Sequence, residues 1–244
     1  MSENSIRLGK STYALHHLPT RGQNLFYILF LVLSPVLNAS INLFAFEDFR
    51  HLSKHGAHHQ FDFLNSLSEV SGQLFGAMLV LLGLNLIFAL QRRHRRIRDS
   101  LLLFGVFSSL YLLLNLITVS YGIFVFKVQS GDLLAISAAI YGSLNIVFLF
   151  WYWYFDYPDQ IKHLHHPDHP CQIAFPIGRA NHHGGWVPNF LDYLYLTIMV
   201  SNTLGPPENH SPIGDQVKVV QLIHSTTMLV LLVIFVSRAI NTLA

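Results

Sequence analysis

The sequence predicts an all-α integral membrane protein with five membrane-spanning helices and one re-entrant, pore-like helix. Only 11% of the 244 residues are charged and 52% are apolar, whereas about 25% of a soluble domain is usually charged. A helix needs about 20 apolar residues to cross a hydrocarbon core of roughly 30 Å. Five runs of that length carry no fixed charge: Leu25–Phe46, Val70–Gln91, Leu101–Phe126, Leu133–Phe155 and Val219–Ser237.

These runs divide the chain into four parts. Residues 1–24 are polar and form a predicted cytoplasmic segment, and the run after them is too long for a signal peptide, so we expect it to be retained as a membrane helix. The four helices within residues 25–155 form a membrane bundle. Residues 156–189 form a histidine-rich loop, and residues 190–244 hold the pore-like helix, a filter-like turn and the final spanning helix.

Basic residues predict the orientation of the chain. They concentrate in the N-terminal segment and in the stretch QRRHRRIR at residues 91–98. Because cytoplasmic loops are enriched in Lys and Arg, we expect the N-terminus, residues 91–98 and the loop 156–189 to lie inside. The Arg-rich stretch is interpreted as an anchor near anionic lipid headgroups. The net charge of +2 predicts no nucleic-acid partner, and the partner expected for the apolar runs is the lipid bilayer.

The apolar piece Phe190–Leu204 is shorter than the spanning runs and carries Asp192. It lies between Pro188 and the pair Pro206–Pro207, and proline is tolerated in a first helical turn but ends a helix when it follows. At 1.5 Å per residue such a helix covers only about two-thirds of the hydrocarbon core. The sequence therefore predicts a re-entrant helix, which needs protein or a water-filled cavity to cover its end.

The order of these parts resembles the pore module of potassium-channel-like pore-loop membrane proteins. PNFLDYLYLTIMV corresponds to the pore helix, Thr203 to the filter threonine and Gly205 to the first filter glycine, and Val219–Ser237 to the inner helix. The likeness is strongest to an uncharacterised bacterial branch that lacks the selectivity signature. It implies a multi-pass protein of the cell (inner) membrane, a homo-tetramer with one shared pore, and a permeant cation.

The resemblance also assigns candidate site residues. Pore- or filter-like positions are Ser201, Asn202, Thr203, Leu204, Gly205 and Glu208, and pore-lining candidates are His224, Thr226 and Thr227. Proline locks φ near −65°, so Pro206 and Pro207 are incompatible with a potassium filter, and potassium selectivity is not predicted. Glu208 would favour cations at a pore mouth. The alternatives are a hydrogen bond from His224 to a neighbouring helix and a non-conducting scaffold.

Eight of the fifteen histidines fall in two clusters. His163, His165, His166 and His169, with Cys171, lie in the predicted loop, and His51, His55, His58 and His59 lie after the first apolar run. Neutral imidazole is the commonest metal ligand, so residues 163–171 are a candidate zinc or copper site, with a pH sensor or solvated side chains as alternatives.

The spacing of the first cluster resembles the histidine boxes of membrane di-iron desaturases and hydroxylases, which implies metal-dependent lipid oxidation. Those enzymes gather their histidines on one membrane face, whereas three predicted crossings separate the two clusters here. This separation counts against an enzyme, and a histidine-rich metal-binding protein or a di-iron lipid oxidase is the alternative to a channel.

Two further patterns concern helix packing. Asn85, Asn115 and Asn145 stand one on each of three predicted helices and are expected to form hydrogen bonds between helices. The run Trp151–Phe155 is interpreted as an interfacial aromatic belt. The five apolar spans contain no carboxylate, which argues against a proton-coupled transporter built on Asp or Glu.

Overall fold

The computed structural model describes residues 32–37, 39–40, 58–90, 94–125, 130–176 and 186–243. The elements in these ranges are α3 (His58–Leu90), α4 (His94–Val125), α5 (Ser130–His165), β1 (Ile173–Ala174), α7 (Phe190–Thr203), β2 (Ser211–Pro212) and α8 (Asp215–Leu243). The first predicted spanning run, Leu25–Phe46, falls mostly outside the described residues, and its described part is helical.

Within the described residues, four helices are long and apolar enough to cross a membrane. These segments are Glu69–Phe88, Arg98–Ile123, Leu133–His165 and Asp215–Arg238, and they coincide with four of the five predicted spans. Their outer faces carry large apolar side chains such as Leu134 and Leu222, which are 73% and 70% exposed. The four helices indicate a membrane-embedded protein, because such faces are stable against lipid rather than water.

One predicted boundary is wrong. The loop expected from Asp156 begins only after His165, because α5 continues through Pro158. A proline inside a helix removes one backbone hydrogen bond and costs about 3 kcal/mol or more. Here the side chains of Asp156 and Gln160 are buried and bonded to other elements when the helix continues, and these tertiary contacts favour the longer helix.

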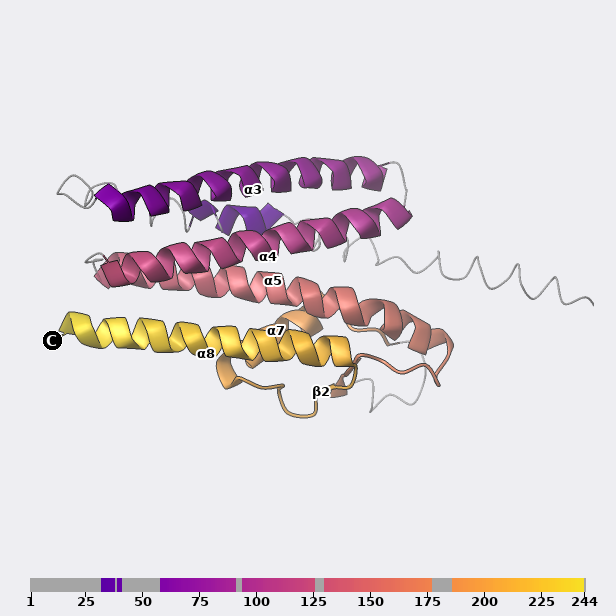
Figure 1. Ribbon diagram of the computed structural model, residues 1–244. Helices are drawn as coiled ribbons and strands as arrows, with labels where there is room; N and C mark the ends of the chain where they lie inside the picture. The colour runs from indigo at the N-terminus through magenta and orange to yellow at the C-terminus, as the bar shows by residue number, and fades with distance from the viewer. Residues whose placement is uncertain are drawn as a thin grey trace, which may run out of the picture.

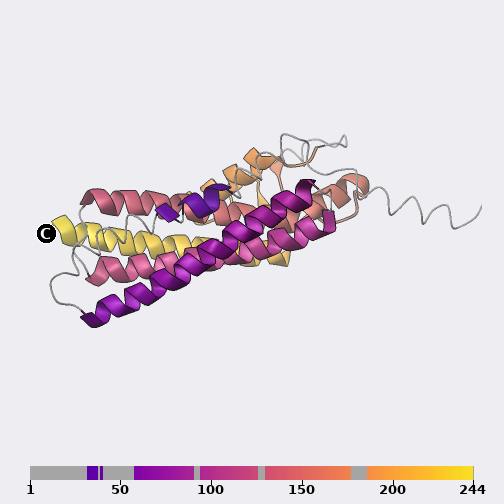
Figure 2. The ribbon, with the colours of Figure 1, turned by 90° about the horizontal axis from the view of Figure 1, so that it is seen from above.

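The long helices run side by side in alternating directions (Figure 1). Viewed from above, α3 crosses α4 obliquely, while α5 lies close to α4 and α8 (Figure 2). The ends of α3 and α5 and the starts of α4 and α8 share one end of the bundle (Figure 1). Arg98 of α4 lies 5.6 Å from the ring of Tyr154 of α5, so the start of α4 packs against the second half of α5.

Close packing joins α4 to α5. Gly105 of α4 faces the ring of Phe150, and a Cβ atom at this position would overlap that ring. The helical residues 32–37 also contact α4, through a hydrogen bond of 2.5 Å between Ser34 Oγ and Ser108 Oγ. Beyond α5, β1 pairs with β2 in an antiparallel ribbon that sets Ile173 opposite Pro212.

Candidate functional site

The short helix α7 has a well-defined start. Asn189 is its N-cap and accepts hydrogen bonds from the backbone N–H groups of Leu191 and Asp192, while the Asn189 N–H donates to Asp192 Oδ2 at 2.7 Å. This reciprocal pair satisfies N–H groups that have no partner within the helix. Asp192, which looked out of place in an apolar segment, therefore serves to begin the helix.

The end of α7 is set by backbone conformation. Leu204 adopts a left-handed conformation with φ of 57° directly before Gly205, and this conformation terminates a helix. Thr203 Oγ1 lies within hydrogen-bonding distance of the carbonyls of Met199 and Gly205, at 2.7 and 2.9 Å. The proline pair follows, so the helix is stopped both by its backbone and by its sequence.

Three contacts define the path of α7 along α5. Tyr193 bonds to Asp156, Ser201 to Asn145, and Asn202 to Tyr141. The two helices are therefore antiparallel, and α7 runs from the end of α5 to about its middle. The chain then returns to the same end of α5, where β2 pairs with β1.

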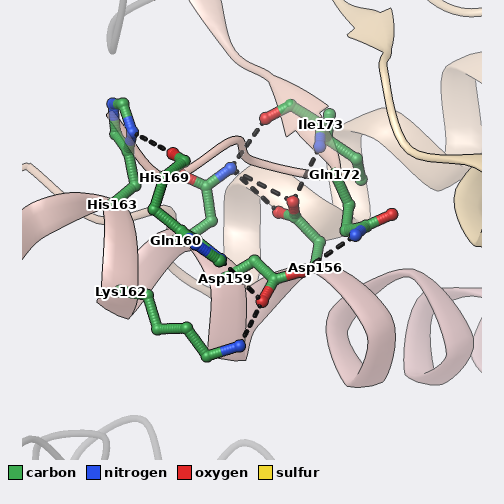
Figure 3. A network of polar contacts seen from close by, with 8 residues as sticks. All are labelled: Asp156, Asp159, Gln160, Lys162, His163, His169, Gln172 and Ile173. Atoms are coloured by element: carbon green, nitrogen blue, oxygen red, sulfur yellow. Dashed lines mark hydrogen bonds and ion pairs between the residues drawn. The ribbon is translucent and has the colours of Figure 1, made fainter. Parts of the chain in front are cut away.

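A buried carboxylate anchors the start of α7. Asp156 is 0% exposed and accepts hydrogen bonds from Tyr193 Oη at 2.7 Å and from the Ile173 N–H at 2.7 Å. Gln160 Nε2 lies 3.1 Å from the same carboxylate and 2.7 Å from the Ile173 carbonyl oxygen (Figure 3). This Asp156 cluster, formed by Asp156, Gln160, Ile173 and Tyr193, joins α5 to β1 and to α7.

Sequence reasoning missed this cluster, because Asp156 was taken as the first residue of a loop. A usable signal was present in the spacing. Asp156, Asp159 and Gln160 are separated by three and four positions, which places them on one face of a helix. Asp159 binds Lys162 Nζ at 2.7 Å and Gln172 Nε2 at 2.8 Å (Figure 3).

A second polar cluster lies at the middle of α5. His224 of α8 is 0% exposed, and its Nε2 is 2.9 Å from Ser201 Oγ while its Nδ1 is 3.3 Å from Tyr152 Oη. Ser201 Oγ is in turn 2.8 Å from Asn145 Oδ1, and the imidazole stacks on Phe148 with ring centroids 4.1 Å apart. This His224 cluster, formed by Asn145, Tyr152, Ser201 and His224, joins α5, α7 and α8.

The direction of the hydrogen bonds in the His224 cluster follows from its acceptors. Asn145 Nδ2 donates to the carbonyl of Tyr141, so its Oδ1 is the atom that accepts from the Ser201 hydroxyl. A hydroxyl has one proton to donate, so Ser201 must accept from the Nε2–H of His224. The remaining ring nitrogen, Nδ1, then accepts from the Tyr152 hydroxyl, and a neutral imidazole satisfies every bond.

The residues predicted to form the pore differ in their exposure to solvent. Asn202, Thr203, Leu204 and Glu208 are exposed, Gly205 is half-buried and Ser201 is buried; on α8, His224 is buried, Thr226 is exposed and Thr227 is half-buried. The hydrogen-bonding alternative for His224 is confirmed by its bond to Ser201 of α7. His224 and Thr226 face different sides of α8, because successive helical residues are turned by about 100°.

The asparagines behave differently from one another. Asn145 bonds to α7, and Asn115 of α4 accepts from Ser71 of α3 at 3.4 Å, so both form the expected bonds between helices. Asn85 instead donates to the Leu81 carbonyl within its own helix.

The residues of the predicted metal site at 163–171 lie partly in α5 and partly in the segment after it. His163 and His165 belong to the last turn of α5, and His166, His169 and Cys171 follow it. His163 Nδ1 lies 2.7 Å from the carbonyl oxygen of His169, and His169 Nε2 lies 3.2 Å from Asp159 Oδ1. Within the described parts of the chain, no group of three or more His, Cys, Asp or Glu is placed to hold a metal. Zinc or copper binding stays a prediction.

Two members of the first histidine cluster belong to the described residues. His58 and His59 begin α3, at the end of the bundle opposite the end of α5 (Figure 1), while His51 and His55 lie outside the described residues.

Comparison of the chain with protein-family models, with curated proteins and with solved structures finds no match.

Proposed function

We propose that this chain is one subunit of a channel-like membrane protein whose copies share a cation path at α7 and the turn after it. The observation that carries the proposal is the path of α7, which enters beside the end of α5, stops near its middle and returns to the same end. In a bilayer this path makes residues 190–212 a re-entrant segment beside five spanning helices. The fifth is the run Leu25–Phe46.

The exposed turn supports sharing between copies. Asn202, Thr203 and Leu204 are exposed on the single chain, and Leu204 has left a regular helix. Irregular backbone at membrane depth is tolerated only where protein or water covers it, because an unsatisfied polar group in hydrocarbon costs several kcal/mol. Four copies around an axis, as the pore-loop resemblance implies, would cover the turn and surround it with water.

The chemistry of the turn favours cations. Glu208 is an exposed carboxylate just past the proline pair, and rings of carboxylates attract cations in channels. The prolines at 206 and 207 exclude the run of backbone carbonyls that selects potassium, so we propose cation permeation without potassium selectivity. Thr226, on the exposed face of α8, is a better candidate for the wall of the path than His224, which holds α5, α7 and α8 together.

The proposed orientation places the Arg-rich end in the cytoplasm. The start of α4, with Arg95, Arg96 and Arg98, and the end of α5 lie at the same end of the bundle, and basic residues are enriched on the cytoplasmic side. The re-entrant segment then enters from inside, and five crossings place the N-terminus inside as well.

Reconstitution tests the proposal. The purified chain is placed in liposomes, and uptake of thallium, potassium and sodium ions is followed while native mass spectrometry counts the copies. We expect tetramers and cation uptake that Glu208→Gln lowers several-fold. The matched control is Asp168→Asn, an exposed carboxylate in the segment after α5, which should leave uptake unchanged. Monomers without uptake would favour the non-conducting scaffold and overturn the proposal.

A further inference from the structure

We infer that the groove between α4, α5 and α8 is a binding site for one acyl chain of a glycerophospholipid. The groove has a volume of about 710 Å³, and its walls include Leu113, Leu116, Val147, Trp151, Val219 and Ile223. Ligand sites in proteins generally measure about 300 to 1,000 Å³. The inference depends on the membrane location indicated by the four apolar helices and is independent of the shared pore.

The length of the groove matches one leaflet of a bilayer. Its lining on α8 extends from Asp215 to Thr227, which is about 18 Å at 1.5 Å per residue. The hydrocarbon core is roughly 30 Å thick, so one leaflet is about 15 Å deep. A lipid whose head lies at the start of α8 would therefore have room for one extended tail along the groove.

The polar atoms inside the groove already have partners. Thr227 Oγ1 donates to the carbonyl of Ile223 at 2.7 Å. Ser109 Oγ donates to the carbonyl of Gly105 and accepts from Trp151 Nε1, at 2.8 and 2.9 Å. With these atoms satisfied, the middle of the groove offers a ligand only apolar contact, which is what an acyl chain needs.

Polar side chains stand at one end of the groove. Asp215 and Gln216 line it where α8 begins, and Lys218 Nζ lies 3.2 Å from Asp215 Oδ1. The Asp215 side chain is 97% exposed, so this end is open to a headgroup. The Lys218 ammonium can bind a lipid phosphate, whereas a hydrocarbon without a charged head would leave it unused.

Tryptophan fluorescence gives a direct test. Trp151 lies in the wall of the groove, and phospholipids with brominated acyl chains quench a tryptophan that they touch. The full chain is purified in mild detergent and titrated with dibrominated phosphatidylcholine at increasing mole fraction. We expect saturable quenching at low mole fraction, and its loss in Trp151→Phe, which leaves Trp153 and Trp186 as reporters outside the groove.

Matched variants of α8 separate a site from general contact with lipid. The double variant Val219→Phe with Ile223→Phe fills the groove and should weaken the saturable quenching at least threefold. Leu222→Phe with Leu229→Phe changes two exposed residues of the same helix that do not line the groove, and should leave quenching unchanged. Lys218→Gln should weaken binding of the phospholipid but not of a brominated alkane.

Two outcomes would overturn the inference. Quenching that rises in proportion to mole fraction and is equal in all variants would show ordinary lipid at the protein surface. Absence of Trp151 quenching would show that protein covers the groove. Both results are independent of ion uptake, so a failed flux experiment and a failed lipid experiment remain distinguishable.

Discussion

α3 and α5 are both long apolar helices, yet they bury different shares of their residues. Within the most apolar stretch of α5, 56% of the residues are buried inside the protein, against 17% in α3. The difference follows from their neighbours, because α5 packs against α4, α7 and α8, whereas α3 packs chiefly against α4. Among the described residues, α3 therefore keeps more of its surface exposed than α5 does.

Polar side chains follow the same division. Four buried side chains of α5 reach other elements: Asn145 and Tyr152 in the His224 cluster, and Asp156 and Gln160 in the Asp156 cluster. On α3, Ser71 donates to Asn115 of α4 at the longer distance of 3.4 Å, and Asn85 bonds within its own helix. Directional contacts thus fix α7 and α8 on α5, where the proposed path lies, while α3 is held mainly by packing. Four experiments test this contrast.

The largest expected effect comes from the Asp156 cluster. Asp156→Ala removes the acceptor of the Tyr193 and Ile173 hydrogen bonds and leaves buried donors unsatisfied, each costing about 1 to 3 kcal/mol. The expected loss of unfolding free energy is about 3 kcal/mol or more, measured by thermal unfolding in detergent. Asp168→Ala, at an exposed site, should change it by less than about 0.5 kcal/mol.

A milder variant covers the case in which Asp156→Ala does not fold. Tyr193→Phe removes one donor and keeps the ring, and should cost about 1 kcal/mol. Equal stability of the wild type, Asp156→Ala and Tyr193→Phe would mean that the Asp156 cluster does not help to hold α7 on α5.

The second effect tests packing between α4 and α5. Gly105→Ala forces a Cβ atom against Phe150, and overpacking of this kind costs about 1 to 3 kcal/mol. Gly83 of α3 has no atom within 4 Å of such a Cβ, so Gly83→Ala should be neutral or stabilising by up to about 1 kcal/mol. Unfolding in detergent compares the two, and a larger loss for Gly83→Ala would reverse the contrast.

The third effect concerns the His224 cluster. Ser201→Ala removes bonds to both His224 and Asn145, and hydrogen bonds between membrane helices average about 0.6 kcal/mol, with a maximum of about 1.7. We expect a loss of about 1 kcal/mol in the same assay. Ser137 of α5 bonds only to the Leu133 carbonyl among its described contacts, and Ser137→Ala should have a smaller effect. Losses of equal size would mean that the bonds between helices add nothing.

The smallest effect is a pH dependence beside the Asp156 cluster. Burial, and then the charges of Asp156 and Asp159, raise the pKa of the Cys171 thiol to about 11 from 9.0. The thiolate is the reactive form, so maleimide labelling should be slow at pH 8 and rise as the pH approaches 11. Asp159→Asn removes a negative charge, lowers this pKa and should speed labelling at pH 9. A labelling midpoint near pH 9 in the wild type would show that burial and the two carboxylates do not raise the pKa of Cys171.

The limits of the short helix α7 were predictable because they depend on neighbouring residues. Pro188 before the helix and Pro206–Pro207 after it bracket α7, whose observed bounds are Phe190–Thr203. The end of α5 was not predictable in this way. Pro158 signals a helix boundary in isolation, and α5 passes through it where β1 and α7 supply partners for its side chains.

The sequence alone determined the four apolar helices of the described residues, since the length and hydropathy of a spanning helix are local properties. Only the tertiary structure decided which polar side chains are buried and what they bind. Asp156 meets Tyr193, and His224 meets Tyr152 and Ser201, residues far apart along the chain. A buried polar group needs a partner, and the partner is known only once the helices have packed.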